Sequence, residues 1–285
     1  LRIGPEILKG VADSYRRLRN TMRFMLGSLS DYDVSDETVS NEMPELERWV
    51  LHRLCELDEK VQQGYDSYDF QGVFQAVFTF ATVDLSSFYF DIRKDVLYCD
   101  GDTIERRSAR TVLNLLFHRL TTWLAPILVF TMEEVWLERY PDKDSSVHLV
   151  DIPNTPSEWR DDKLAKKWSI VRNYRRLVTS ALELQRVDKV IGSSLEAAPT
   201  VHVQDKDALS VLESVPFKDI CITSDIKLTS ANPPKDAYRS SEIDGAAVDF
   251  KKSVGTKCER CWKILPDVGN FKHPSTCGRC STALK

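Results

Sequence analysis

Four cysteines near the end of the printed sequence form its clearest chemical pattern. Two residues separate Cys258 from Cys261 and Cys277 from Cys280, and fifteen residues lie between the two pairs. A two-residue spacing lets one tight turn direct two thiolates at the same ion, and four thiolates complete a tetrahedral zinc shell. Glycine at position 278 suits the second turn, because glycine adopts a left-handed backbone at little cost. The spacing predicts one closed, structural zinc site.

Other interpretations of these cysteines are weaker. Two disulfides would need an oxidising compartment, of which the sequence gives no other sign. A redox pair is usually single, and a catalytic zinc ion keeps a position open for water, which four cysteines do not leave. His273 lies between the pairs but is expected to be a loop residue, because four thiols are available. The other three cysteines, Cys55, Cys99 and Cys221, are expected to be partly buried thiols.

Length and composition limit the number of domains and the compartment in which the protein is expected. The chain of 285 residues has room for about two domains. We find no signal peptide and no apolar run of membrane-spanning length, so we expect a soluble, cytoplasmic protein that does not contact a membrane. The odd number of cysteines, seven, fits a reducing compartment.

The net charge of -4 is distributed unevenly. Residues 1–27 hold six Lys or Arg against two acids, residues 160–189 nine against four, and residues 251–285 eight against two. Three basic segments in an otherwise acidic chain could hold a polyanion at chosen places and repel it elsewhere. The alternative, three solvated helix faces, remains open on charge alone.

The hydrophobic spacing predicts the elements that position these residues. Five long helices are expected at Pro5–Leu29, from near Pro44 to about Gly64, at Asp69–Asp91, at Thr103–Tyr140 with a break at Pro126, and at Asp161–Val190. The first carries an apolar stripe from Leu8 to Leu29. His118 is expected to be a packing residue. The fold class is therefore mainly α, an antiparallel helical bundle.

The pattern changes after Gly192. Residues 200–204, 218–223, 226–229 and 246–250 are predicted strands, and Asp205 caps a short helix that reaches Ser214. These segments predict a small α+β module before the cysteines. We expect three domains: a helical bundle at 1–192, the α+β module at 193–254 and a four-cysteine zinc ribbon at 255–285.

At this level of detail the sequence resembles a known family. The start of the anticodon-binding region of class Ia aminoacyl-tRNA synthetases is similar to two segments here, LRIGPEILKG and YRRLRNTMRFMLGSLSDYD. The isoleucine-specific members of that class are similar to three further segments, VDLSSFYFDIRKDVLYCD, LAPILVFTMEEVW and VIGSSLEA. KCERCW and HPSTCGRC resemble the C-terminal zinc ribbon of their bacterial and organellar forms. The motifs follow one another in the same order along the whole chain.

The resemblance implies an enzyme that attaches isoleucine to its tRNA with ATP. The HIGH and KMSKS motifs that hold ATP in this family do not occur here, nor does a Rossmann unit or an editing domain. We therefore expect the C-terminal, tRNA-binding part of such a ligase, inactive alone and monomeric. Its expected partners are the tRNA for isoleucine and a catalytic domain outside this sequence, where ATP would bind.

Helical phase and the basic segments suggest which residues hold RNA. Lys and Arg neutralise phosphates, while unpaired bases stack on aromatic or guanidinium planes. Trp262 and Arg260 lie at the first cysteine pair and could contact a base or ribose; alternatively, Trp262 covers the apolar side of the ribbon. Each arginine alone could equally be a solvated surface residue. The predicted tRNA contacts in the bundle are Arg16, Arg19, Asn20, Arg23, Arg172, Arg175 and Arg176.

Two functions from other classes compete with tRNA binding. Similar ribbons occur at the ends of base-excision glycosylases, so a DNA-binding or repair adaptor is the first alternative, but the sequence shows no catalytic amine or acid in a suitable arrangement. A helical interaction protein with a zinc staple and no nucleic-acid role is the other alternative. Competition between tRNA and duplex DNA separates the three.

Overall fold

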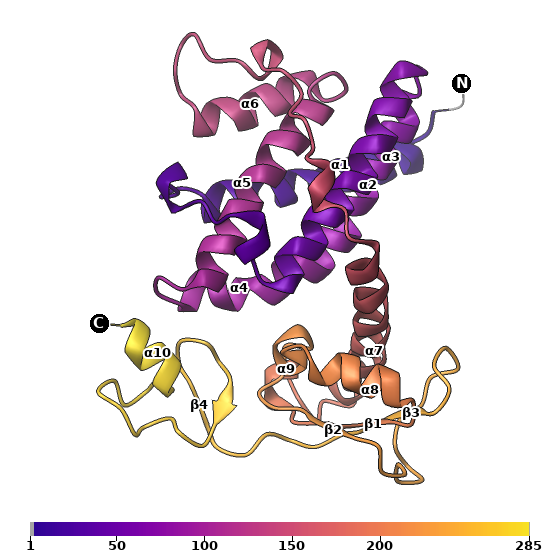
Figure 1. Cartoon of the computed structure of the whole chain (residues 1–285), viewed down its shortest axis with the longest axis vertical. Helices are drawn as coiled ribbons and strands as arrows, with labels where there is room; N and C mark the ends of the chain where they lie inside the picture. The colour runs from indigo at the N-terminus through magenta and orange to yellow at the C-terminus, as the bar shows by residue number, and fades with distance from the viewer. Residues whose placement is uncertain (1–2, 285) are drawn as a thin grey trace. The chain divides into compact units, whose positions relative to one another are not determined.

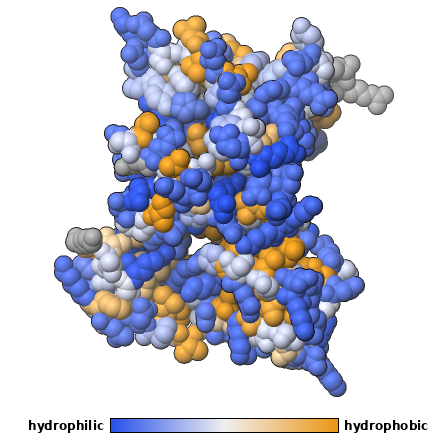
Figure 2. Space-filling view, viewed as in Figure 1, coloured by the Kyte–Doolittle hydropathy of each residue, from blue (hydrophilic) through white to orange (hydrophobic). Residues whose placement is uncertain are grey.

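The structure is a computed structural model that describes residues 3–284. Contacts divide the chain into two units. The first comprises the residues up to Leu97 together with Asp102–Asp162, and the second comprises Tyr98–Gly101 together with the residues from Lys163 onward. The described part is mainly helical with small sheets, as predicted. On the face shown in Figure 2, hydrophilic residues predominate and hydrophobic residues are scattered among them.

The first unit consists of long helices, drawn in indigo to magenta in Figure 1. They are α1 (Pro5–Ser28), α2 (Glu45–Asp66), α3 (Phe70–Thr79), the π-helical η3 (Phe80–Tyr89), α4 (Phe90–Cys99), α5 (Ile104–Leu124) and α6 (Val129–Arg139). Short 3-10 turns lie in its loops: η1 (Val34–Asp36), η2 (Ser40–Glu42), η4 (Val147–Leu149) and η5 (Ser157–Trp159).

Local chemistry explains where these helices begin and end. The Asp69 side chain accepts a hydrogen bond from the Gly72 amide at 2.9 Å, and that of Thr103 accepts one from Arg106, so both residues cap a helix N-terminus. The break between α5 and α6 contains Pro126, which has no amide hydrogen to continue the helix.

Helices α3, η3 and α4 run on without a break, so the predicted end of the third helix at Asp91 is wrong. In η3 the hydroxyl of Ser86 donates to the carbonyl of Ala81 at 2.8 Å, a five-residue spacing that reflects the wider π turn. Arg93 on α4 donates two hydrogen bonds, at 2.6 and 2.5 Å, to the buried Glu47 of α2. This ion pair ties the central helix into the core.

The expectation that the chain lacks an apolar run of membrane-spanning length needs correction. By length and composition alone, Phe70–Cys99 could cross a membrane, the one such helix among the described residues. Half of its most apolar window is buried inside the protein, and Arg93 is paired within the core. A helix that is apolar on most sides and lies within a bundle has this composition for packing reasons.

The apolar stripe of α1 is buried only along its second half. Leu18, Met22 and Met25 are fully buried, whereas Leu8 and Val11 are exposed. The first half of the helix therefore presents an apolar surface that the described part of the first unit does not cover.

The second unit contains α7 (Asp162–Val187, all but its first residue), η6 (Ser194–Glu196), and a sheet in the order β2-β1-β3. Its elements are β1 (Thr200–Val203), α8 (Lys206–Glu213), α9 (Phe217–Ile220), β2 (Lys227–Thr229) and β3 (Ala246–Asp249), with β1 parallel to β2 and antiparallel to β3. Asp205 caps α8, as predicted. The strand predicted at 218–223 is wrong: α9 and a turn lie there, because Phe217 and Ile220 are buried at helical spacing.

Candidate metal centre and nucleic-acid interface

Two short segments of the second unit carry the four cysteines. Strands β4 (Thr256–Lys257) and β5 (Ile264–Leu265) form a hairpin whose connection holds Cys258 and Cys261. The Cys258 amide donates to the carbonyl of Lys263 and the Trp262 amide donates to that of Cys258, both at 2.9 Å. These bonds close the first turn. The second pair lies at the start of α10 (Gly278–Ala283), with Cys277 as its N-cap.

Gly278 serves a purpose other than the predicted one. It is the first residue of α10 and does not have a positive φ. A Cβ atom at this position would lie 2.7 Å from the ring of Phe271, so any other residue would have to displace the aromatic ring. The Gly278 amide donates to a carboxylate oxygen of Asp267 at 3.0 Å, which fixes the turn.

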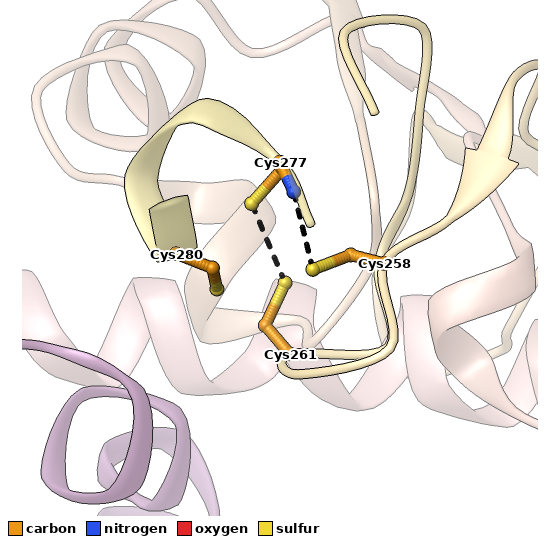
Figure 3. Close-up of side chains that lie close together, drawn as sticks. All are labelled: Cys258, Cys261, Cys277 and Cys280. Atoms are coloured by element: carbon orange, nitrogen blue, oxygen red, sulfur yellow. Dashed lines mark hydrogen bonds between the residues drawn. The ribbon is translucent and has the colours of Figure 1, made fainter. Parts of the chain in front are cut away.

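The four sulfur atoms face a common centre, as Figure 3 shows. All lie within 4.8 Å of one another, and those of Cys261 and Cys277 are 3.8 Å apart. A tetrahedral ion with zinc–sulfur bonds of about 2.3 Å needs sulfurs separated by about 3.8 Å. All four side chains are buried. The donor set fits a closed thiolate site, so the group could hold a metal ion.

Burial makes thiolates costly here. It raises the pKa of Cys261 to about 12 and raises that of Cys280 above its ordinary value. Burial acts in the same direction on Cys258, but amide groups of Cys261, Cys277 and Arg260 donate to its sulfur and lower its pKa to about 6. Several buried thiolates can coexist here only beside a compensating cation. His273 is outside the group of four.

In the first unit, the predicted RNA contacts of α1 lie together. Arg16, Arg19, Asn20 and Arg23 line one groove of about 960 Å³, which we call the α1 groove. Its other wall includes the exposed Glu134 and Glu138 of α6, which the sequence analysis did not identify. Arg19 lies 3.6 Å from Glu134, and Arg16 lies 2.8 Å from Asp13. Exposed ion pairs of this kind contribute little stability, so phosphates could replace the acids.

The three arginines predicted on α7 differ from one another. Arg176 is exposed and forms an ion pair of 3.0 Å with the exposed Glu242. Arg175 is half-buried, and its Nε donates to the carbonyl of Ile220 at 2.8 Å, which links α7 to α9. Arg172 is also half-buried. Helical phase indicated the basic face but could not separate an exposed guanidinium from one engaged in packing.

Trp262 projects from the ribbon. It is 61% exposed, has a φ of 64°, and lies with its ring centroid 5.8 Å from the Lys257 ammonium. Most of its indole therefore faces solvent, and Leu265 and Val268 are the apolar side chains that pack against the cysteines. The predicted contact Arg260 is half-exposed, and its guanidinium donates to the Tyr98 carbonyl at 3.4 Å.

Comparison with known proteins assigns a family to this arrangement. Residues 47–201 match the anticodon-binding domain of tRNA ligase. The chain belongs to that family of anticodon-binding domains. The matched range covers most of the helical unit, α7 and the start of the small sheet, whereas α1 and the ribbon lie outside it.

Relatives extend the match of this anticodon-binding domain to the whole chain. Isoleucine–tRNA ligase of Ruegeria pomeroyi is 66% identical over 284 residues, covering 99% of this chain and 29% of the relative. The isoleucine–tRNA ligases of Brucella abortus and Bradyrhizobium diazoefficiens are 49% and 45% identical over 286 residues, covering 100% of this chain. The chain spans 29% and 28% of those two relatives.

Proposed function

We propose that this chain is the anticodon-binding part of an isoleucine–tRNA ligase. The observation that carries the proposal is the 66% identity with such a ligase along 99% of the chain. The parent enzyme would attach isoleucine to its tRNA with ATP, as a soluble cytoplasmic protein. Because the ATP-holding motifs of the family do not occur in the 285 residues, this chain alone would bind RNA without catalysing the reaction.

Charge and shape support RNA binding at the α1 groove and on α7. Three exposed arginines on one wall could hold phosphates, and the facing carboxylates would repel them, so the RNA backbone could follow only one side of the groove. Arg176 adds an exposed cation on α7. Arg172 and Arg175 contribute to the same basic face, with Arg175 mainly holding α9.

The ribbon would provide a second contact. We propose that Cys258, Cys261, Cys277 and Cys280 hold one structural zinc ion, on the basis of their sulfur spacing and burial. A bound zinc ion would supply no chemistry to the reaction and would only hold the two segments together. Trp262 and Arg260 would then stand on a rigid support, where the exposed indole can stack on a base.

The exposed half of α1 suggests where the rest of the ligase would dock. Ile7, Leu8 and Val11 line an apolar groove of about 550 Å³ together with Phe74 and Leu128. The relatives are more than three times as long as the segment that this chain matches. We propose that the catalytic part of the parent protein covers this surface and that the assembled ligase is a monomer.

Competition binding tests the function. A fluorescent tRNA for isoleucine should bind the chain and be displaced by unlabelled tRNA but not by duplex DNA at equal nucleotide concentration. Displacement by both would favour a DNA-binding adaptor, and failure to bind either at low salt would favour an interaction module without a nucleic-acid role.

A further inference from the structure

The short helix α9 connects the ribbon to α7. Its residue Asp219 forms an ion pair with Lys263, which directly follows the exposed Trp262: the Lys263 ammonium lies 2.7 Å from a carboxylate oxygen of Asp219. The next residue of α9, Ile220, accepts the hydrogen bond that Arg175 of α7 donates at 2.8 Å. All of these residues belong to the second unit. Two neighbouring residues of α9 therefore link the turn that carries the indole to the basic helix α7.

The turn that follows α9 makes a second connection to the ribbon. Ser224 is buried; the Ile264 amide of β5 donates to its hydroxyl oxygen at 2.7 Å, and that hydroxyl donates to the Leu195 carbonyl. The same turn contains Ile222 with a φ of 56°, a left-handed conformation that is strained for a β-branched residue. Such a conformation persists only where the surrounding contacts fix it. Strand β5 is therefore attached to a turn that has little freedom to move.

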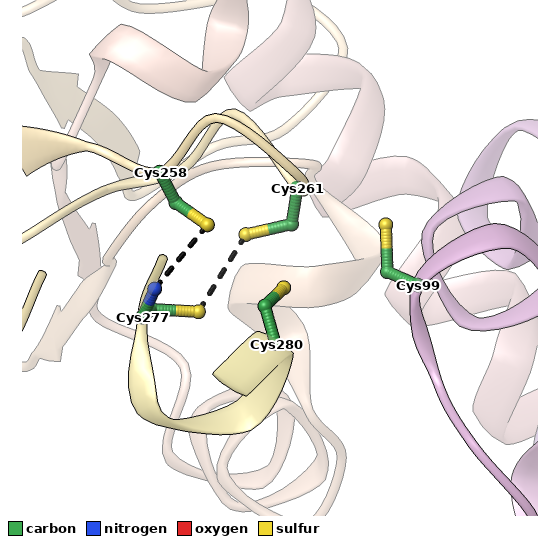
Figure 4. Close-up of a cluster of buried hydrophobic side chains, with 5 residues drawn as sticks. All are labelled: Cys99, Cys258, Cys261, Cys277 and Cys280. Carbon is green, nitrogen blue, oxygen red and sulfur yellow. Dashed lines mark hydrogen bonds between the residues drawn. The ribbon is translucent and has the colours of Figure 1, made fainter. Parts of the chain in front are cut away.

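The turn that carries Trp262 is also held from its other side. The Arg260 guanidinium donates to the Tyr98 carbonyl at 3.4 Å, and the Cys99 sulfur lies 3.6 Å from the Arg260 carbonyl oxygen. Figure 4 shows Cys99 beside the four cysteines of the ribbon. Trp262 thus lies between two residues, Arg260 and Lys263, whose side chains both contact other segments of the second unit.

Exposure indicates what the Lys263 ion pair does. The side chain of Lys263 is 13% exposed and that of Asp219 is 42% exposed. Salt screens a partly buried pair less than an exposed one, so this cation is better suited to hold the turn than to bind a phosphate. A binding side chain contributes fully only when its support holds it close to the productive geometry.

We propose that Asp219, acting through Lys263, is a positioning residue that holds the Trp262 indole where it can stack on an RNA base. The inference rests on the proposed function, because it explains how the ribbon would make its RNA contact. The indole and the basic face of α7 would then bind RNA as one preorganised surface, with α9 as the joint between them.

Removal of the Asp219 carboxylate tests the inference by the sign of its effect. On charge alone, loss of an acid should strengthen binding to a polyanion. If Asp219 positions the indole, Asp219→Ala should instead weaken binding of a transcript of the tRNA for isoleucine to the zinc-loaded full chain, by at least about threefold. Asp225→Ala removes an exposed acid of the same unit and should bind at least as tightly as the wild type. Zinc content and unfolding midpoint should match in the two variants, because the Asp219 side chain is partly exposed and leaves no cavity.

A double-mutant cycle separates positioning from a general effect on the fold. In Trp262→Gly, the further change Asp219→Ala should cause no additional loss of RNA affinity, because no indole remains to be positioned. Equal weakening in the presence and absence of Trp262 would overturn the inference, as would an Asp219→Ala chain that binds as tightly as Asp225→Ala. Failure of the wild-type chain to bind the transcript would overturn the proposed function and this inference with it.

Discussion

The sulfur atoms of Cys261 and Cys277 lie 3.8 Å apart although sixteen positions separate the two residues. The hairpin β4–β5 fixes one sulfur, and the N-terminus of α10 fixes the other. Their separation matches the edge of a tetrahedron around a zinc ion, about 3.8 Å for bonds of about 2.3 Å. The ribbon is therefore organised around a position at which four cysteine sulfur atoms converge.

Removal of one ligand should release the metal without unfolding the helical unit. We expect Cys277→Ser to lower zinc affinity by more than about 100-fold, since loss of an outer-shell partner alone costs 10- to 100-fold. Metal analysis after gel filtration measures the zinc content, and circular dichroism measures helicity. Cys55→Ser, in the first unit, is the matched control. Full zinc content in Cys277→Ser would contradict the assignment.

The α1 groove should dominate the salt dependence of RNA binding. Replacing Arg19 and Arg23 with Ala removes two cations, so the negative slope of log K against log salt should become shallower by about 2. Glu134→Gln should instead strengthen binding, because it removes a repulsive charge and releases Arg19. Lys94→Ala, which removes an exposed cation elsewhere in the unit, is the control. An unchanged slope in the double variant would exclude the groove as an RNA contact.

Replacement of Arg175 should affect the stability of the fold, and replacement of Arg176 should affect RNA binding. Arg176→Ala removes an exposed cation and should weaken tRNA binding with little change in the unfolding midpoint. Arg175→Ala leaves the Ile220 carbonyl without its donor and should lower the free energy of unfolding by about 1–3 kcal/mol. Thermal unfolding and filter binding of both variants check this. The reverse ranking would show that Arg175 is the RNA contact.

Trp262 should matter for RNA and not for the metal. Its positive φ suits glycine, so Trp262→Gly should keep zinc while losing about 1–3 kcal/mol of RNA binding if the indole stacks on a base. Phe271→Ala should show the opposite pattern, because the Phe271 ring packs on Gly278 beside two cysteines. Zinc titration and RNA binding are measured in parallel. Unchanged RNA affinity in Trp262→Gly would leave the indole without a role in binding.

His118 should make the helical unit less stable in mild acid. Burial, with Arg139 and Arg119 adding to it, lowers the pKa of His118 to about 4, and its Nε2 lies 3.0 Å from the Tyr140 hydroxyl. The folded protein therefore favours neutral histidine, so the stabilisation is complete above about pH 6.5 and is lost as the pH falls toward 4.

The loss should reach up to about 2 kcal/mol after allowance for solvent screening. Urea unfolding between pH 7 and 4 measures it, and His118→Gln, which does not titrate, should show a shallower dependence. Identical pH profiles for the two proteins would mean that other groups control acid stability.

Much of the fold follows from short-range sequence patterns. The long helices apart from the end of the third, the Asp205 cap and the convergence of the four cysteines each depend on residues close together in the chain, and these predictions are confirmed. The failures involve tertiary packing. The segment 218–223 has β-branched residues typical of a strand, but burial of Phe217 and Ile220 favours the helix α9.

The candidate sites show the same division. The convergence of the four cysteines could be predicted because one spacing identifies all four. The acidic wall of the α1 groove could not, because Glu134 lies far from α1 in sequence and only tertiary structure brings it there. The position of Cys99 beside the four cysteines could not be predicted either, because its partner Arg260 lies more than 150 positions later in the sequence.

The most direct test of the account is the affinity of the zinc-loaded chain for two transcripts of the tRNA for isoleucine, one natural and one with its anticodon replaced. We expect the natural transcript to bind at least about tenfold more tightly, since each lost base contact costs about 1–3 kcal/mol. Equal affinities would contradict anticodon recognition by this chain.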